Sequence, residues 1–114
     1  MGSLDTVKIR RMKVLLFVQI INGLVNSCPS ECRCESRDRV YCNNRGFKEI
    51  PAGIPLRTKV LHLQDNSLVS SNRLDEELEK LVYLERVMLY SNRLERVPKF
   101  RSTSLRELRL NSNR

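Results

Sequence analysis

The sequence has no tryptophan, one histidine and few aromatic residues, which make up 5% of its 114 residues. A nucleic-acid-binding protein is not expected, because such proteins stack bases on aromatic side chains. The lone histidine, His62, has no cysteine or serine beside it in the arrangement of a catalytic nucleophile. We therefore predict a non-enzymatic protein without a cofactor, and its core should be aliphatic. The formal net charge of +8 favours acidic partners without naming one.

Long apolar runs are also scarce, and the longest lies near the N-terminus. It reads VLLFVQIINGLV over residues 14–25 and follows the basic stretch KIRRMK. A basic region, a short apolar region and a small residue before a polar start are typical of a secretory signal peptide, which we place at residues 1–27. A buried strand or helix is the alternative. No later segment is long enough to cross a membrane, so we expect a secreted chain.

All four cysteines lie within CPSECRCESRDRVYC, residues 28–42. They could bind a metal or form two disulfides. A four-cysteine zinc site usually has two well-separated C-x2-4-C pairs, whereas here three cysteines crowd together and one stands alone. Secretion favours disulfides, and we predict no metal site. Spacing alone allows three pairings and does not choose among them.

A repeated pattern occupies the second half of the chain. The stretches TKVLHLQDNSL, LERVMLYSNRL and LRELRLNSNR align on Asn66, Asn92 and Asn113 and follow L-x-x-L-x-L-x-x-N-x-L. This is the leucine-rich repeat, three times in phase, with the last copy incomplete. Alternating leucines point to one face of a short strand, so stacked repeats form a parallel sheet over a shared core. The asparagine side chain should hydrogen-bond backbone groups where the chain leaves the strand.

The repeats differ in length, at 26 and 21 residues between successive asparagines. In the longer repeat, leucines at i, i+4 and i+7 predict a short amphipathic helix over residues 74–82, with Asn72 as its N-cap. The acidic residues 75–79 are expected on its solvated face. In the shorter repeat, Pro98 excludes a long helix and predicts an extended segment.

The motif C-x3-C-x-C-x7-C followed by IPAGIP resembles the N-terminal cysteine cap of extracellular leucine-rich repeat proteins. The repeat alternation is similar to that of small leucine-rich proteoglycans of the decorin and podocan type, and the chain also resembles fibronectin leucine-rich transmembrane proteins. The resemblance implies an α/β solenoid with a parallel concave sheet, capped over residues 28–56 and followed by repeats over residues 57–114. It also implies disulfides Cys28–Cys34 and Cys32–Cys42.

The chain departs from the proteoglycan pattern in several respects. It has no Ser-Gly site, no Asn-X-Ser/Thr sequon and no second cysteine cluster to form a C-terminal cap. We therefore expect a truncated solenoid. The leading hypothesis is a secreted protein of extracellular-matrix type that binds a matrix protein, growth factor or receptor. The alternatives are the N-terminal part of a cell-surface adhesion or guidance receptor, and a truncated product without its own activity.

Residues between the core leucines should point away from the core and line the concave sheet, where solenoids of this kind bind proteins. Beside Val60, the candidate binding residues are His62, Gln64, Arg86, Met88, Tyr90, Glu107, Arg109 and Asn111. Exposed Met and Tyr next to Arg are typical of interface centres. The alternative is an ordinary solvated face on which Arg86 pairs with Glu107.

A second candidate surface is basic and lies late in the chain. It comprises Arg93, Arg96, Lys99, Arg101 and Arg106. Sulfated glycosaminoglycan is the natural extracellular polyanion for such a surface. Because acidic residues interrupt the cluster and its members fall on different faces, a solvated basic surface is the favoured interpretation.

Overall fold

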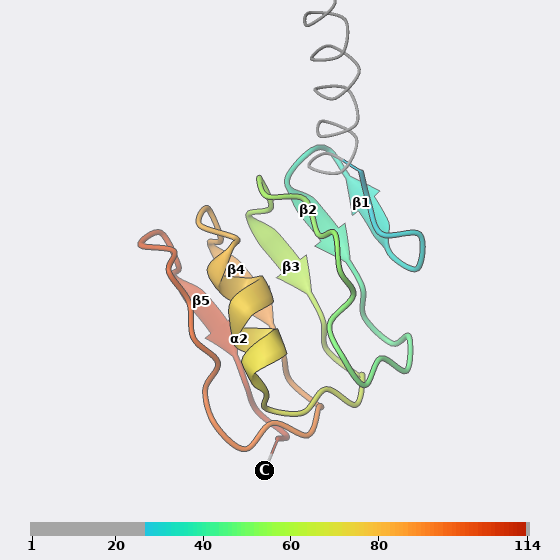
Figure 1. The fold of residues 1–114 in the computed structure, drawn as a ribbon, viewed down its shortest axis with the longest axis vertical. Coiled ribbons are helices and arrows are strands. Elements are labelled where there is room, and N and C mark those ends of the chain that lie inside the picture. The colour runs from blue at the N-terminus through green and yellow to red at the C-terminus, as the bar shows by residue number, and fades with distance from the viewer. Residues whose placement is uncertain (1–26, 114) are drawn as a thin grey trace, which may run out of the picture.

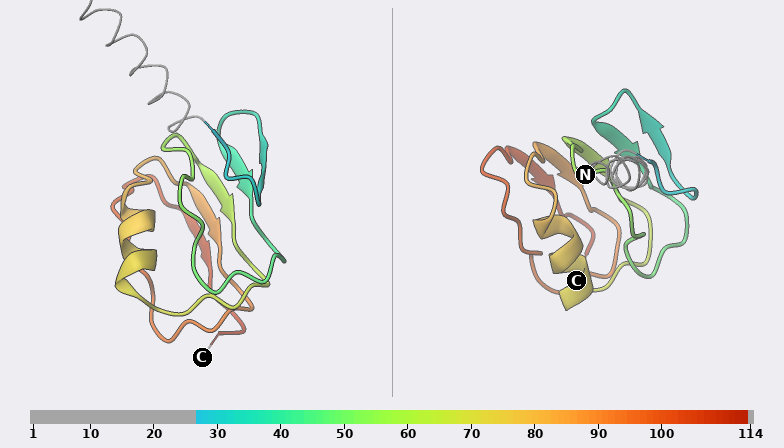
Figure 2. Two further views of the ribbon diagram at one scale, coloured as in Figure 1. Left: turned by 45° about the vertical axis from the view of Figure 1, so that its right-hand side comes forward. Right: turned by 45° about the horizontal axis from the view of Figure 1, so that its top comes forward.

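The computed structural model describes residues 27–113, so the predicted signal peptide lies outside the described residues apart from Ser27. A five-stranded sheet runs in the order β1-β2-β3-β4-β5 (Figure 1). Its strands are short: β1 is Arg33–Glu35, β2 Arg39–Tyr41, β3 Val60–His62, β4 Arg86–Met88 and β5 Glu107–Arg109. The helix α2, Asn72–Glu79, lies across the core from the sheet (Figure 2).

The sheet has two kinds of pairing. β1 and β2 form an antiparallel hairpin, and every later strand pairs in parallel with the one before it. Parallel neighbours require a crossover segment between them, and each repeat supplies one by returning along the other side of the core. The predicted α/β solenoid with a parallel sheet is confirmed.

The core follows from the alternation of apolar residues along each strand. Leu61, Leu63, Val87 and Leu89 are fully buried. They stack in register because Leu61 lies opposite Val87 across β3 and β4. In the last repeat Leu108 and its neighbours are only partly buried, since no repeat within residues 27–113 covers them.

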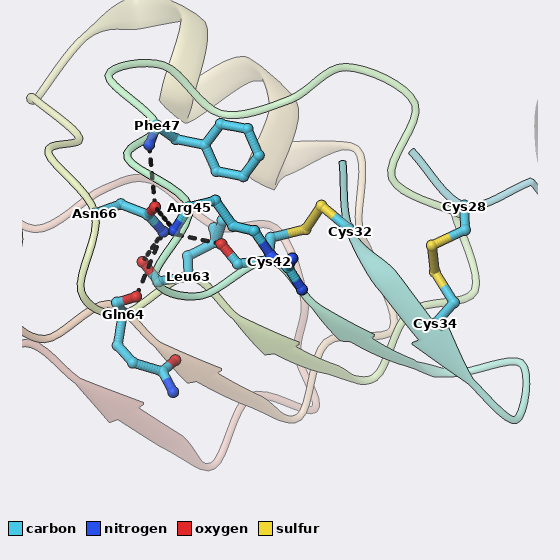
Figure 3. The surroundings of a disulfide bond; sticks show 9 residues. All are labelled: Cys28, Cys32, Cys34, Cys42, Arg45, Phe47, Leu63, Gln64 and Asn66. Carbon is cyan, nitrogen blue, oxygen red and sulfur yellow. Dashed lines mark hydrogen bonds between the residues drawn. A yellow bond between two sulfur atoms is a disulfide. The ribbon is translucent and has the colours of Figure 1, made fainter. Parts of the chain in front are cut away.

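Asn66 shows what the repeated asparagine does in each unit. Its Nδ2 donates to the carbonyl oxygens of Cys42 and Leu63, each at 2.9 Å. Its Oδ1 accepts from the backbone N–H groups of Arg45 (2.9 Å) and Phe47 (3.0 Å) in the preceding turn (Figure 3). One side chain therefore satisfies backbone groups of two successive units where the chain leaves the strand.

The next two asparagines repeat this arrangement. Asn92 Nδ2 donates to Leu63 O at 3.0 Å, and Asn113 Nδ2 donates to Leu89 O at 2.9 Å. The backbone bonding predicted for these asparagines is confirmed, and each one also bonds to the unit before it.

The predicted helix is present, but its start was assigned to the wrong residue. Ser71, not Asn72, is the N-cap: its backbone is extended and its Oγ accepts from Leu74 N at 3.1 Å. Asn72 is already helical. The helix also ends at Glu79, because the next turn tightens into a hydrogen bond from Leu81 N to Leu78 O.

In the shorter repeat, residues 95–105 contain neither helix nor strand, as Pro98 predicts.

Candidate interaction surface

Two disulfides hold the N-terminal cap together. They join Cys28 to Cys34, with Cα atoms 5.9 Å apart, and Cys32 to Cys42, with Cα atoms 4.6 Å apart (Figure 3). This is the pairing that the family resemblance implies. Among residues 27–113 no group of three His, Cys, Asp or Glu side chains is placed to hold a metal ion.

The cap extends the sheet rather than merely covering its end. β2 lies parallel to β3, with Val40 opposite Leu61 and Tyr41 opposite His62. Val40 is buried at 1% exposure, so Tyr41 faces the opposite side, away from the core. The Tyr41 and His62 rings lie 4.5 Å apart at 59°.

Sequence reasoning missed this contribution of the cap to the concave face. The signal was present, because the apolar Val40 between Arg39 and Tyr41 repeats the alternation of Arg86–Met88. Arg33 on β1 adds to the same surface, with its guanidinium carbon 4.8 Å from the Tyr41 ring centroid.

The strand register arranges the outward-facing side chains in rows. One row runs Arg33, Tyr41, His62, Met88 and Arg109, and a second runs Glu35, Arg39, Val60, Arg86 and Glu107. Beyond the strand ends, hydrogen bonds from Asp65 N to Tyr90 O (3.1 Å) and from Ser91 N to Asn111 O (3.0 Å) keep the segments of Gln64, Tyr90 and Asn111 side by side.

Ion pairs organise the charges of this face. Glu107 lies 3.6 Å from Arg86 and 3.0 Å from Arg109, so one carboxylate forms ion pairs with two guanidinium groups. Arg33 pairs with Glu35 at 3.2 Å. Arg39 makes no ion pair within residues 27–113. Four arginines and two glutamates give these two rows a surplus of positive charge.

His62 lies half-buried in the middle of the surface. Burial lowers the pKa of His62, and the nearby positive charge of Arg39 lowers it further, whereas the adjacent Gln64 amide opposes the shift. The imidazole is therefore neutral at physiological pH. Gln64 Oε1 is buried and has no hydrogen-bond donor in place within the described part of the chain.

The late basic cluster is largely paired with carboxylates of the preceding repeat. Arg96 lies 2.7 Å from Asp75, Arg106 lies 3.5 Å from Glu85 and Arg101 lies 4.0 Å from Glu79. The remaining members, Arg93 and Lys99, make no ion pair with residues 27–113. These contacts connect successive repeats and leave less free charge for a polyanion than the sequence suggests.

Asp75 corrects the expectation that the acidic residues between positions 75 and 79 lie on a solvated face. Only 4% of Asp75 is exposed, because it packs under the loop of the next repeat. Its Oδ1 accepts from Lys99 N at 3.0 Å, in addition to the pair with Arg96. The Arg96 hydrogen bond lowers the pKa of Asp75, with a smaller contribution from the Lys99 N–H.

Comparison with known proteins agrees with this geometry. Residues 27–55, which contain both disulfides and the β1–β2 hairpin, match the family model for the leucine rich repeat N-terminal domain. The chain begins its described part with such a domain. Leucine-rich repeats follow it and continue the same sheet.

The relatives of this capped solenoid are much longer proteins. The chain is 38% identical over 80 residues to mouse leucine-rich repeat transmembrane protein FLRT2, a match covering 70% of this chain and 12% of that protein. It is 34% identical over 82 residues to a leucine-rich repeat and immunoglobulin-like domain-containing nogo receptor-interacting protein 1 from Xenopus tropicalis, covering 69% of this chain and 13% of that protein. The chain thus spans about an eighth of the length of these relatives.

Within residues 27–113 there is no helix of the length and apolar character needed to cross a bilayer.

Proposed function

We propose that this chain is a non-enzymatic, extracellular interaction module that binds a protein partner through the concave face of its sheet. The observation that carries this proposal is the continuous outward-facing surface from β1 to β5. It brings Tyr41, His62 and Met88 into one row flanked by arginines. Aromatic, Met and Arg side chains on a rigid sheet offer contact area and charged hydrogen bonds at low entropic cost.

The partner class follows from charge and compartment. Two disulfides favour an oxidising, extracellular location, and the surplus arginines favour a partner surface rich in carboxylates. We propose secretion into the extracellular space or matrix, with a matrix protein, growth factor or receptor as ligand.

The binding face can be tested with substitutions on opposite sides of the molecule. One relative is named for interaction with the Nogo receptor, so the Nogo receptor ectodomain is a first probe within an array of purified extracellular proteins. Tyr41→Ala, Tyr90→Ala and Arg109→Glu should each weaken binding of the captured protein at least tenfold, by surface plasmon resonance. Glu76→Lys, an exposed charge reversal on α2, is the control. Equal binding by all four variants would exclude the concave face.

A second candidate is the start of a cell-surface receptor ectodomain. It is favoured by the match to mouse FLRT2, which is named as a transmembrane protein. Full-length transcript sequencing combined with membrane fractionation distinguishes the two: a later membrane span and recovery in the membrane fraction support the receptor. Release into the medium without such a span supports the secreted protein.

A further inference from the structure

The arginines of the described chain fall into two groups. From residue 58 to residue 113 every arginine except Arg93 lies within 4.0 Å of a carboxylate, namely Arg73, Arg86, Arg96, Arg101, Arg106 and Arg109. Before residue 58 Arg33 is paired with Glu35. The other four arginines there make no ion pair with any residue from 27 to 113, namely Arg37, Arg39, Arg45 and Arg57. The unpaired positive charge therefore gathers at the N-terminal end of the solenoid.

Arg37 and Arg57 line the same cavity. Its volume is about 290 Å³ and its lining residues are Cys34, Ser36, Arg37, Val40, Pro55 and Arg57. None of the six is acidic. The two segments that form the cavity, residues 34–40 and 55–59, carry four basic residues against Glu35 and Asp38, so their net charge is +2 (4 − 2). The volume lies near the lower limit of small-molecule sites, which is about 300 Å³.

Both walls of the cavity are held in place by covalent or buried contacts. On one side Cys34 is bonded to Cys28 and pairs across the hairpin with the buried Val40. On the other side Thr58, which is fully buried, fixes the turn through its Oγ1–H to Pro55 O at 2.6 Å. The backbone of these walls therefore loses little conformational entropy when a ligand binds, and the entropic cost falls on the exposed side chains of Arg37 and Arg57.

We propose that this cavity binds an oxyanion of the sulfate type. The planar guanidinium groups of Arg37 and Arg57 match the geometry of tetrahedral oxyanions, and the Ser36 hydroxyl is a neutral donor beside them. None of the residues that line the cavity carries a carboxylate, so an anion meets no negative side chain of the lining. Free sulfate and the sulfate ester of an extracellular polysaccharide present the same chemistry. The site lies apart from the late basic cluster, whose arginines are mostly neutralised.

Titration of the full chain with two probes tests the site and identifies the source of the anion. The probes are sodium sulfate and a sulfated heparin disaccharide, each followed by isothermal calorimetry at constant ionic strength. Arg37→Gln and Arg57→Gln should each weaken disaccharide binding about tenfold or more, since each removes a charge-assisted hydrogen bond. Arg93→Gln, which removes the unpaired arginine of the repeats, should bind like the wild type.

The two probes give distinguishable outcomes. Tighter binding of the disaccharide than of sulfate indicates a polysaccharide ligand, and equal binding indicates the free anion; both support the site. Absence of binding by the wild type, unchanged binding in both cap variants, or an equal loss in Arg93→Gln would overturn it. Intact mass with both disulfides formed and an unchanged melting temperature exclude misfolding of the variants.

Discussion

Asp75 joins two repeats through a single carboxylate. Its side chain contacts Arg96 and the backbone N–H of Lys99, both from the following repeat. The carboxylate is covered by these immediate neighbours rather than placed deep in the core, and the Arg96 side chain is 44% exposed. The contact is therefore a hydrogen-bonded connection at the edge of the core, partly screened by solvent.

Substitution of Asp75 by alanine should lower the free energy of unfolding by about 1–2 kcal/mol, because the Lys99 N–H loses its acceptor and Arg96 its partner. Urea denaturation measures the change. Glu76→Ala, the neighbouring exposed acid on the same helix, is the matched control and should change little. Equal stability of the two variants would show that the contact contributes nothing.

This contribution should depend on pH. Because the folded-state pKa of Asp75 is lowered, its stabilisation is fully present above the unfolded pKa of about 3.9 and is lost as the pH falls through the folded-state value. The stability difference between wild type and Asp75→Asn should therefore shrink between pH 5 and pH 2, as measured by thermal unfolding. A difference that is constant over that range would contradict the assignment.

The sequence could not reveal the role of Asp75. Within the acidic run 75–79 its side chain is chemically ordinary, and periodicity places it only beside the buried Leu74. Its partner Arg96 lies 21 residues further on, in the next repeat. The periodicity of the helical sequence therefore predicts its apolar face correctly, but it does not predict contacts between repeats.

Among the elements, the strand and its asparagine form the repeating unit. Asn92 is 8% exposed, donates to Leu63 O and accepts from Leu68 N at 2.9 Å. Asn92→Ala should lower the free energy of unfolding by roughly 2–4 kcal/mol, because it leaves buried backbone groups without partners. Urea denaturation with Asn111→Ala as the exposed control tests this. A cost no larger than that of the control would show that the asparagines are dispensable.

Elements were predictable to the extent that they depend on local pattern. The L-x-L strands, their register and the bonding role of the asparagines follow from a period-two pattern repeated in phase. The helix start did not, because Ser71 and Asn72 are both good N-cap residues and only the backbone conformation decides between them.

On the scale of the whole molecule, the cap is both a cover and the first part of the sheet. Cys42 is fully buried, and its backbone is hydrogen-bonded to His62 O and to the Asn66 side chain.

The double variant Cys32→Ala/Cys42→Ala should have a free energy of unfolding lower by about 2–3 kcal/mol from chain entropy, and lower still because the site is buried. Cys28→Ala/Cys34→Ala, whose cysteines are only partly buried, should lose less. Denaturation midpoints compare the two, and the reverse order would contradict this account.

The extent of the concave face was not foreseen, because the candidate binding residues were taken only from the strands of the repeats, from Val60 onward. The cysteine spacing predicts disulfides, but it gives no information about the orientation of Tyr41. The alternation around Val40 indicates a strand of three residues, but it does not by itself show that Tyr41 lies in line with His62. The pairing of the basic cluster likewise depends on which carboxylates the neighbouring repeat brings close.

The direction of the asparagine bonds has a consequence for biosynthesis. The Oδ1 atoms of Asn66, Asn92 and Asn113 each accept from the turn of the unit before them. A turn thus gains its side-chain acceptor only after the next asparagine has been translated. Folding on the ribosome should therefore advance from the N-terminus one repeat behind synthesis, with every newly made unit completing its predecessor.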